Sequence, residues 1–179
     1  MDMKKTTFTI KSKLSLLISL LILVFGCVDY QKNSAFNIKI DLVLQKTDSI
    51  HVYYKNDGSI NFNETEAFWV KVKGNPKNQN VTINFPKNII PNQFRLDLGN
   101  DKKQPEIVLN KITLCFKDKA RSYKGEEIYT ILRVDESNTI LEKSTGILKR
   151  KNKERKAGPS LYPNGDRLYK ALQNLYNQK

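Results

Sequence analysis

The chain holds one histidine, one tryptophan and two cysteines among 179 residues. Because His51 is the single histidine, the sequence excludes metal sites built from several histidines and leaves only this residue for Ser-His-Asp or Cys-His catalysis. Asp48, Ser49 and His51 are close in sequence, but neighbours on an extended strand point to opposite faces. We therefore expect His51 to be an exposed strand residue and not a catalytic base.

The sequence also lacks an apolar run long enough to span a membrane. The stretch Leu14–Phe25 is almost wholly apolar, but a transmembrane helix needs about 20 such residues. It follows a segment with four lysines and one acid, Asp2, and it ends beside a small residue, Gly26. A charged start, a short apolar stretch and a small residue at the end are typical of a secretory signal.

The end of this segment, Val24-Phe25-Gly26-Cys27, resembles the export signal of bacterial lipoproteins. In that family the cysteine thiol receives a diacylglyceryl group and a signal peptidase cuts just before the cysteine. The resemblance implies that residues 1–26 are removed and that Cys27 holds the protein on a membrane lipid layer. Phe25 departs from the family pattern, which has a smaller residue there. The alternatives are an ordinary signal peptide or an uncleaved anchor with Cys27 as an incidental thiol.

The scarcity of cysteine limits how the exported domain is stabilised. If Cys27 is lipidated, Cys115 has no partner for an intramolecular disulfide, so the domain must be held by packing. Cys115 falls in the middle of a predicted strand. A reactive thiol needs a nearby cation or helix start, and we interpret Cys115 as a buried or half-buried structural residue.

Acidic residues are outnumbered by basic ones, 18 against 31. The first 26 residues hold four lysines and one acid, so without them the net charge falls from +13 to +10. An exported protein does not usually meet nucleic acid, so the anionic partners expected here are lipid headgroups, lipopolysaccharide phosphates or acidic glycans. The remaining length suits one domain with a real core and is short for two.

Apolar and polar residues alternate with a period of two in several segments, which predicts strands with one buried face. These segments are residues 36–45, 50–54, 68–73, 81–85, 94–98 and 107–116. Turn residues separate them, at Lys55–Gly58, in a predicted loop at Gly74–Asn78, at Pro86 and at Gly99–Asp101. The pattern predicts a mostly β fold, an antiparallel β-sandwich.

The predicted organisation is a signal (1–26), a tether (27–35), the sandwich domain (36–150), and a basic connector with a C-terminal helix (151–179). Residues 126–134 fit a short helix or a strand, and residues 138–149 a strand or hairpin. The basic run 149–156 is either a solvated connector or a contact for anionic headgroups. Leucines at i, i+4 and i+7 predict a terminal helix that docks on the sandwich (Leu168, Leu172 and Leu175).

The polar strand faces supply the ligand-binding candidates. Alternation places an indole, three cations and a carboxylate on these faces: Trp69, Lys71, Lys73, Arg95 and Asp97. If the strands share a sheet, an indole could stack on a sugar ring while the charged groups hold its hydroxyls. The alternative is an ordinary solvated face with Trp69 covered by the terminal helix.

The turn residues Asp97, Asn100 and Asp101 offer oxygen ligands of the kind that calcium takes, but their spacing matches no EF-hand loop. A Gly-Asn-Asp turn also needs such residues for backbone reasons alone. We expect no metal and no cofactor.

The run Phe94–Gly99 followed by Glu106–Ile112 weakly resembles β-sandwich modules attached to bacterial membrane proteins of envelope polysaccharide metabolism. That resemblance brings no catalytic residues, and no pair of acids can be nominated for glycan cleavage. The expected function is therefore a non-catalytic, membrane-anchored lipoprotein of the cell envelope that binds glycan or assists envelope assembly. The alternative is a protein-interaction subunit of a membrane complex.

Overall fold

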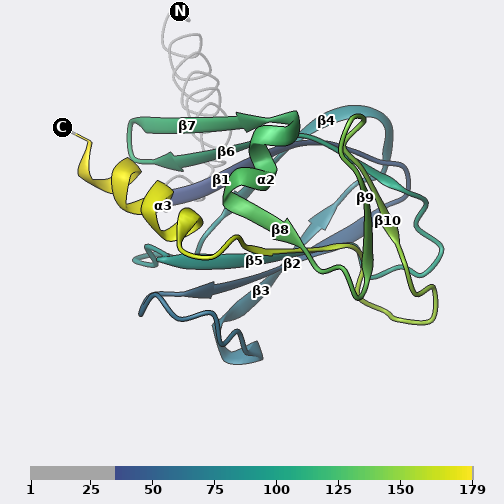
Figure 1. Cartoon of the computed structure of the whole chain (residues 1–179), viewed down its shortest axis with the longest axis horizontal. Helices are drawn as coiled ribbons and strands as arrows, with labels where there is room; N and C mark the ends of the chain where they lie inside the picture. Colours follow the sequence, from purple (N-terminus) through teal and green to yellow (C-terminus); the bar gives the residue numbers. More distant parts are fainter. Residues whose placement is uncertain (1–34, 179) are drawn as a thin grey trace, which may run out of the picture. The chain divides into compact units, whose positions relative to one another are not determined.

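A computed structural model describes residues 35–178 of the chain. Two antiparallel sheets face each other in a β-sandwich (Figure 1). The order of strands in sheet A is β4-β1-β6-β10-β9, and β7 also pairs with β6. The bounds are β1 Phe36–Leu44, β4 Asn75–Asn84, β6 Ile107–Phe116, β7 Lys119–Lys124, β9 Thr139–Glu142 and β10 Ile147–Arg150.

Sheet B has the order β3-β2-β5-β11-β8. Its strands are β2 Asp48–Lys55, β3 Ala67–Val72, β5 Gln93–Leu98, β8 Leu132–Val134 and β11 Ser160–Pro163. β11 lies between β5 and β8, so the segment that follows the basic connector contributes a strand to the sandwich. Trp69, His51 and Asp97 share one row of this sheet, because Trp69 pairs with His51 and His51 with Asp97.

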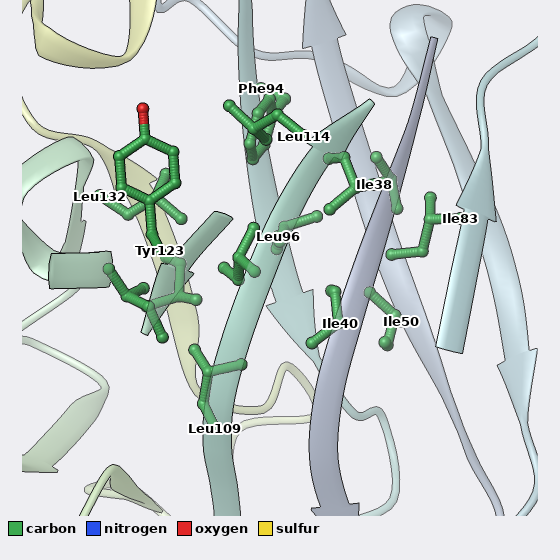
Figure 2. Close-up of a cluster of buried hydrophobic side chains, with 14 of the residues drawn as sticks. Ile38, Ile40, Ile50, Ile83, Phe94, Leu96, Leu109, Leu114, Tyr123 and Leu132 are labelled. Atoms are coloured by element: carbon green, nitrogen blue, oxygen red, sulfur yellow. The ribbon is translucent and has the colours of Figure 1, made fainter. Parts of the chain in front are cut away.

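The core between the sheets comes from the alternation seen in the sequence. Ile38 and Ile40 of β1 are fully buried and lie in one apolar cluster with Ile50 and Leu96 of sheet B (Figure 2). Each buried aliphatic side chain contributes roughly 1.5–3 kcal/mol relative to an exposed one, so this cluster supplies the main driving force for folding.

A helix closes the end of the sandwich at which β1 begins. The helix α3 (Arg167–Asn177) buries Leu168, Leu172 and Leu175 against the core. Tyr176 packs edge-on against Phe116 at 4.8 Å between ring centroids, and its hydroxyl donates to the Pro91 carbonyl. The predicted docking of the terminal leucines on the sandwich is therefore confirmed.

The segment after Lys117 contains both elements that its sequence allowed. A 3₁₀ turn, Gly125–Glu127, leads into the single helical turn α2 (Ile128–Ile131), and β8 follows directly. Residues 139–150 form the β9–β10 hairpin, as predicted.

The predicted loop at Gly74–Asn78 is wrong beyond Gly74. Residues from Asn75 onward already belong to β4, in which Leu44 pairs with Asn75 and Leu42 with Gln79. β4 is an edge strand, and edge strands tolerate proline and polar residues on both faces. The short strands β7 and β11 were not predicted, because neither shows a clear alternation.

The predicted signal, Cys27 and nearly all of the tether lie outside the described residues. Within residues 35–178, no helix has the length and apolar character needed to cross a bilayer.

Candidate functional site on sheet B and its adjoining loops

The five predicted ligand-binding residues do not form one surface. Arg95 and Asp97 lie largely buried on β5, whereas Trp69, Lys71 and Lys73 are exposed along the edge strand β3. The tertiary structure therefore divides them into a covered cluster and an open strip.

In the covered cluster, Arg95 is held from several sides. Its Nε and Nη2 donate to the two carboxylate oxygens of Asp97 at 2.8 and 2.6 Å. Its guanidinium also lies between two rings, 4.8 Å from the Tyr53 centroid and 4.4 Å from that of Tyr162. These contacts hold the side chains of Arg95 and Asp97 in one arrangement on the sheet. Because the two charges are paired with each other, neither is free to bind a ligand.

A loop between β2 and β3 covers this cluster. Glu64 reaches back over the sheet, accepting a hydrogen bond from the Tyr53 hydroxyl at 2.7 Å and lying 3.4 Å from His51 Nε2. Lys55 and Glu66 form a second ion pair beneath the same loop. The local fold begins at Asn63, whose side chain accepts from the amides of Thr65 and Glu66 and so starts a 3₁₀ turn, Glu64–Glu66.

His51 is buried, with 5% of its surface exposed, so the predicted exposed position is wrong. The alternation correctly placed it on the outer face, but that face is covered by the loop and by Trp69. Burial lowers the pKa of His51, and the nearby Glu64 carboxylate offsets part of that effect. Burial and the hydrogen bond to Glu64 raise the pKa of Tyr53.

The open strip, which we call the β3 strip, consists of Trp69, Lys71 and Lys73. The indole of Trp69 stacks on the imidazole of His51 at 3.9 Å between centroids and 12° between planes. It nevertheless keeps 52% of its surface exposed. Since His51 covers one face of the indole, the other face is open to solvent. The terminal helix does not cover Trp69, because α3 packs against β5, β6, β7 and β11.

A buried carboxylate that the sequence analysis missed organises the loops beyond the β3 strip. Asp48 is 8% exposed. It accepts hydrogen bonds from the amides of Ser49, Asn100 and Asp101 and from the side-chain amide of Gln104. Asp48 precedes the predicted strand 50–54 and is far in sequence from residues 100–104, so the sequence gave no signal of this role.

Further hydrogen bonds join these loops to the β3 strip and to the basic connector. Gly74 N donates to Thr47 Oγ1 at 3.0 Å, and Gly158 N donates to the Gly99 carbonyl at 2.8 Å. The Arg150 guanidinium donates to the carbonyls of three connector residues and to that of Asp101. We call this hydrogen-bonded group the loop end; it comprises residues 45–48, 73–75, 99–105 and 150–158.

A separate cleft of about 520 Å³ lies beside β8, at the opposite edge of sheet B from the β3 strip. Tyr129, Arg133, Glu136, Leu141 and Lys143 are among the residues that line it. Its charged groups are balanced in sign, and it does not join the exposed Trp69.

Cys115 is a free, buried thiol, as predicted, and burial raises its pKa. No group of three His, Cys, Asp or Glu side chains among residues 35–178 is arranged to hold a metal ion. The turn residues considered for calcium have other roles. Asp97 binds Arg95, and the amides of Asn100 and Asp101 face Asp48.

Comparisons of the chain with protein-family models, curated proteins and solved structures found no match.

Proposed function

We propose that this protein is a non-catalytic lipoprotein of the cell envelope that binds glycan through the β3 strip. The observation that carries the proposal is the half-exposed indole of Trp69, held flat by its stack on a buried histidine. A rigid ring with one open face suits the apolar face of a sugar, because little conformational freedom is lost on binding.

Lys71 and Lys73 extend the strip beyond the indole. Side chains two residues apart on one face of a strand are separated by about 6.6 Å, so Trp69 and Lys71 are spaced in this way on β3, and Lys73 follows just beyond the end of the strand. Both lysines are exposed, and their ammonium groups can donate to hydroxyl or acidic oxygens of a saccharide chain. The covered Arg95–Asp97 pair supports the sheet beneath the strip and is not part of the contact.

Titration with glycans tests the binding proposal. Trp69 is the only tryptophan in the chain, so its fluorescence reports directly on the strip. We expect envelope polysaccharides to shift this emission, and calorimetry to show that Trp69→Ala lowers affinity about tenfold. Tyr169→Ala is the matched control, because Tyr169 is an exposed aromatic residue on α3. Unchanged emission with every envelope glycan contradicts the proposal.

The lipid anchor is tested on the full-length protein in its native host. Wild-type protein is expected to begin at Cys27, to carry the additional mass of acyl chains and to sediment with membranes. Cys27→Ser is expected to lose the acyl mass and the sedimentation with membranes, because it has no thiol to acylate and stable anchoring needs two or more acyl chains. Equal solubility of the two proteins, with no added mass on either, contradicts the anchor.

A second candidate function, docking on a membrane protein, has one observation in its favour. β9 is an edge strand of sheet A, and its Ile140 keeps 50% of its surface exposed. An exposed apolar residue on an edge strand suits pairing with a partner strand. Recovery of a stoichiometric partner after mild crosslinking, abolished by Ile140→Lys, supports this function.

A further inference from the structure

The loop end carries a concentration of positive charge that the fold assembles from distant parts of the sequence. Its exposed cations are Lys46, Lys73, Lys102, Lys103, Lys151, Lys153, Arg155 and Lys156. The exposed acid among them is Glu154, whose carboxylate lies 3.3 Å from Lys102 Nζ. The positive charges therefore greatly exceed the negative ones on this surface.

These cations stand on an ordered frame. Asp48 fixes residues 99–104 against the start of β2, and Arg150 fixes the connector by donating to the carbonyls of Arg155, Lys156 and Ala157 at 2.5–2.7 Å. Lysines held in this way repel one another without being able to separate fully. An anionic ligand relieves that repulsion, so the surface favours a partner with several negative charges.

The loop end is continuous with the β3 strip. Lys73 belongs to both, and Gly74 beside it is hydrogen-bonded to Thr47. The loop segments 45–47, 99–105 and 151–157 contain no aromatic side chain, whereas single-stranded nucleic acid is bound by stacking of bases on aromatic residues. The adjoining β3 strip adds one aromatic side chain, Trp69, and these segments therefore do not provide the series of stacking rings that binds single-stranded nucleic acid.

The loop end lies at the end of the sandwich opposite to the start of β1. β1 begins at Phe36, which pairs with Phe116 beside α3, and ends near Leu44 beside the loop end. β1 is nine residues long, so its two ends are about 27 Å apart. The first described residues therefore lie at the α3 end of the sandwich, and the loops of the loop end lie at the other end (Figure 1).

We infer that the glycan bound by this protein is acidic, with its carboxylate or phosphate groups held at the loop end and a neighbouring sugar ring stacked on Trp69. This inference rests on the proposed glycan-binding function and adds the chemical class of the ligand. It places the charged groups of the ligand at the end of the sandwich opposite to α3.

The test uses the full-length protein reconstituted in phosphatidylcholine nanodiscs. The probes are polygalacturonate, dextran as a neutral polysaccharide, and vesicles that contain phosphatidylglycerol. A triple variant removes charge from the loop end (Lys102→Gln, Lys153→Gln and Lys156→Gln). The matched control removes three exposed lysines elsewhere (Lys87→Gln, Lys117→Gln and Lys124→Gln).

We expect polygalacturonate to bind, to shift Trp69 emission, and to bind about tenfold or more weakly to the loop-end variant than to the control. Added salt should weaken binding further. Equal affinity for dextran and polygalacturonate, with no loss in the variant, overturns the acidic-ligand inference and leaves glycan binding standing. Preferential binding of the anionic vesicles overturns the inference in favour of lipid headgroups. Absence of binding to every probe overturns both.

Discussion

At the scale of single residues, Asp48 has the clearest structural role. Its carboxylate accepts hydrogen bonds from the amides of Ser49, Asn100 and Asp101 and from the Gln104 side chain. The buried turn at Gly99, where φ is +92° and the Asp48 Oδ2 lies close, suits glycine and no larger residue. One buried acid thus holds together the frame of the positively charged surface.

Removal of this carboxylate should destabilise the protein. Asp48→Ala leaves several backbone amides without an acceptor, and we expect the free energy of unfolding to fall by about 2–4 kcal/mol. Urea unfolding measures the change, with Glu136→Ala, an exposed acid on the β8–β9 turn, as the control. A loss no greater than that of the control contradicts the assigned role.

The second residue-scale prediction concerns His51. Burial lowers the pKa of His51 in the folded chain. The unfolded chain binds a proton at this residue below pH about 6.5, and the folded chain binds it only at a lower pH. The contribution of this site to stability is therefore complete above that pH and is lost as the pH falls below it. NMR titration of the single histidine should give a pKa below 6.5.

A substitution at Glu64 tests the cause of the lowered His51 pKa. The Glu64 carboxylate raises the pKa of His51, so Glu64→Gln should lower that pKa further. A His51 pKa at or above 6.5 in the wild type, or a rise in the variant, contradicts the account of the covered cluster.

At the scale of elements, the strands with one buried face could be predicted and the others could not. β1, β2, β5 and β6 alternate because each places one face in the core and the other outside. β7 and β11 are short, and β7 buries little besides Tyr123, so their sequences show no clear period. β7 pairs with the preceding strand β6, and β11 pairs with β5 and β8, which are distant in sequence.

The terminal helix allows a direct test of packing. Leu172 is fully buried in α3, and Leu172→Ala should lower the free energy of unfolding by about 2–5 kcal/mol because it leaves a cavity. Asn174→Ala on the exposed side of the same helix is the control. If urea unfolding shows the two variants to be alike, α3 is not part of the folding core.

At the scale of the whole molecule, stability comes from packing between the two sheets. Cys115 is free and buried, so a reducing agent should leave the midpoint of urea unfolding unchanged. A disulfide typically contributes about 2–4 kcal/mol, and a loss of that size on reduction contradicts this expectation.

The candidate site could be predicted from the sequence only in part. Alternation correctly assigned Trp69, Lys71, Lys73, Arg95 and Asp97 to outer faces, because side-chain direction on a strand follows from the backbone alone. It could not show that Glu64 covers Tyr53 and His51, because these contacts join segments that meet only in the folded chain. The Arg95–Asp97 ion pair is local, since the two side chains are two residues apart on one face of β5.

Local periods of two and 3.6 residues were sufficient to predict most of the longer strands, the sandwich class and the terminal amphipathic helix. Two contacts appear only in the folded chain: His51 is buried beneath Trp69, and Asp48 joins the start of β2 to the loop 99–105. The tertiary structure also decided that the basic connector and the lysines of the 99–105 loop share one end of the sandwich. These arrangements are contacts between residues far apart in the chain, and no local pattern encodes them.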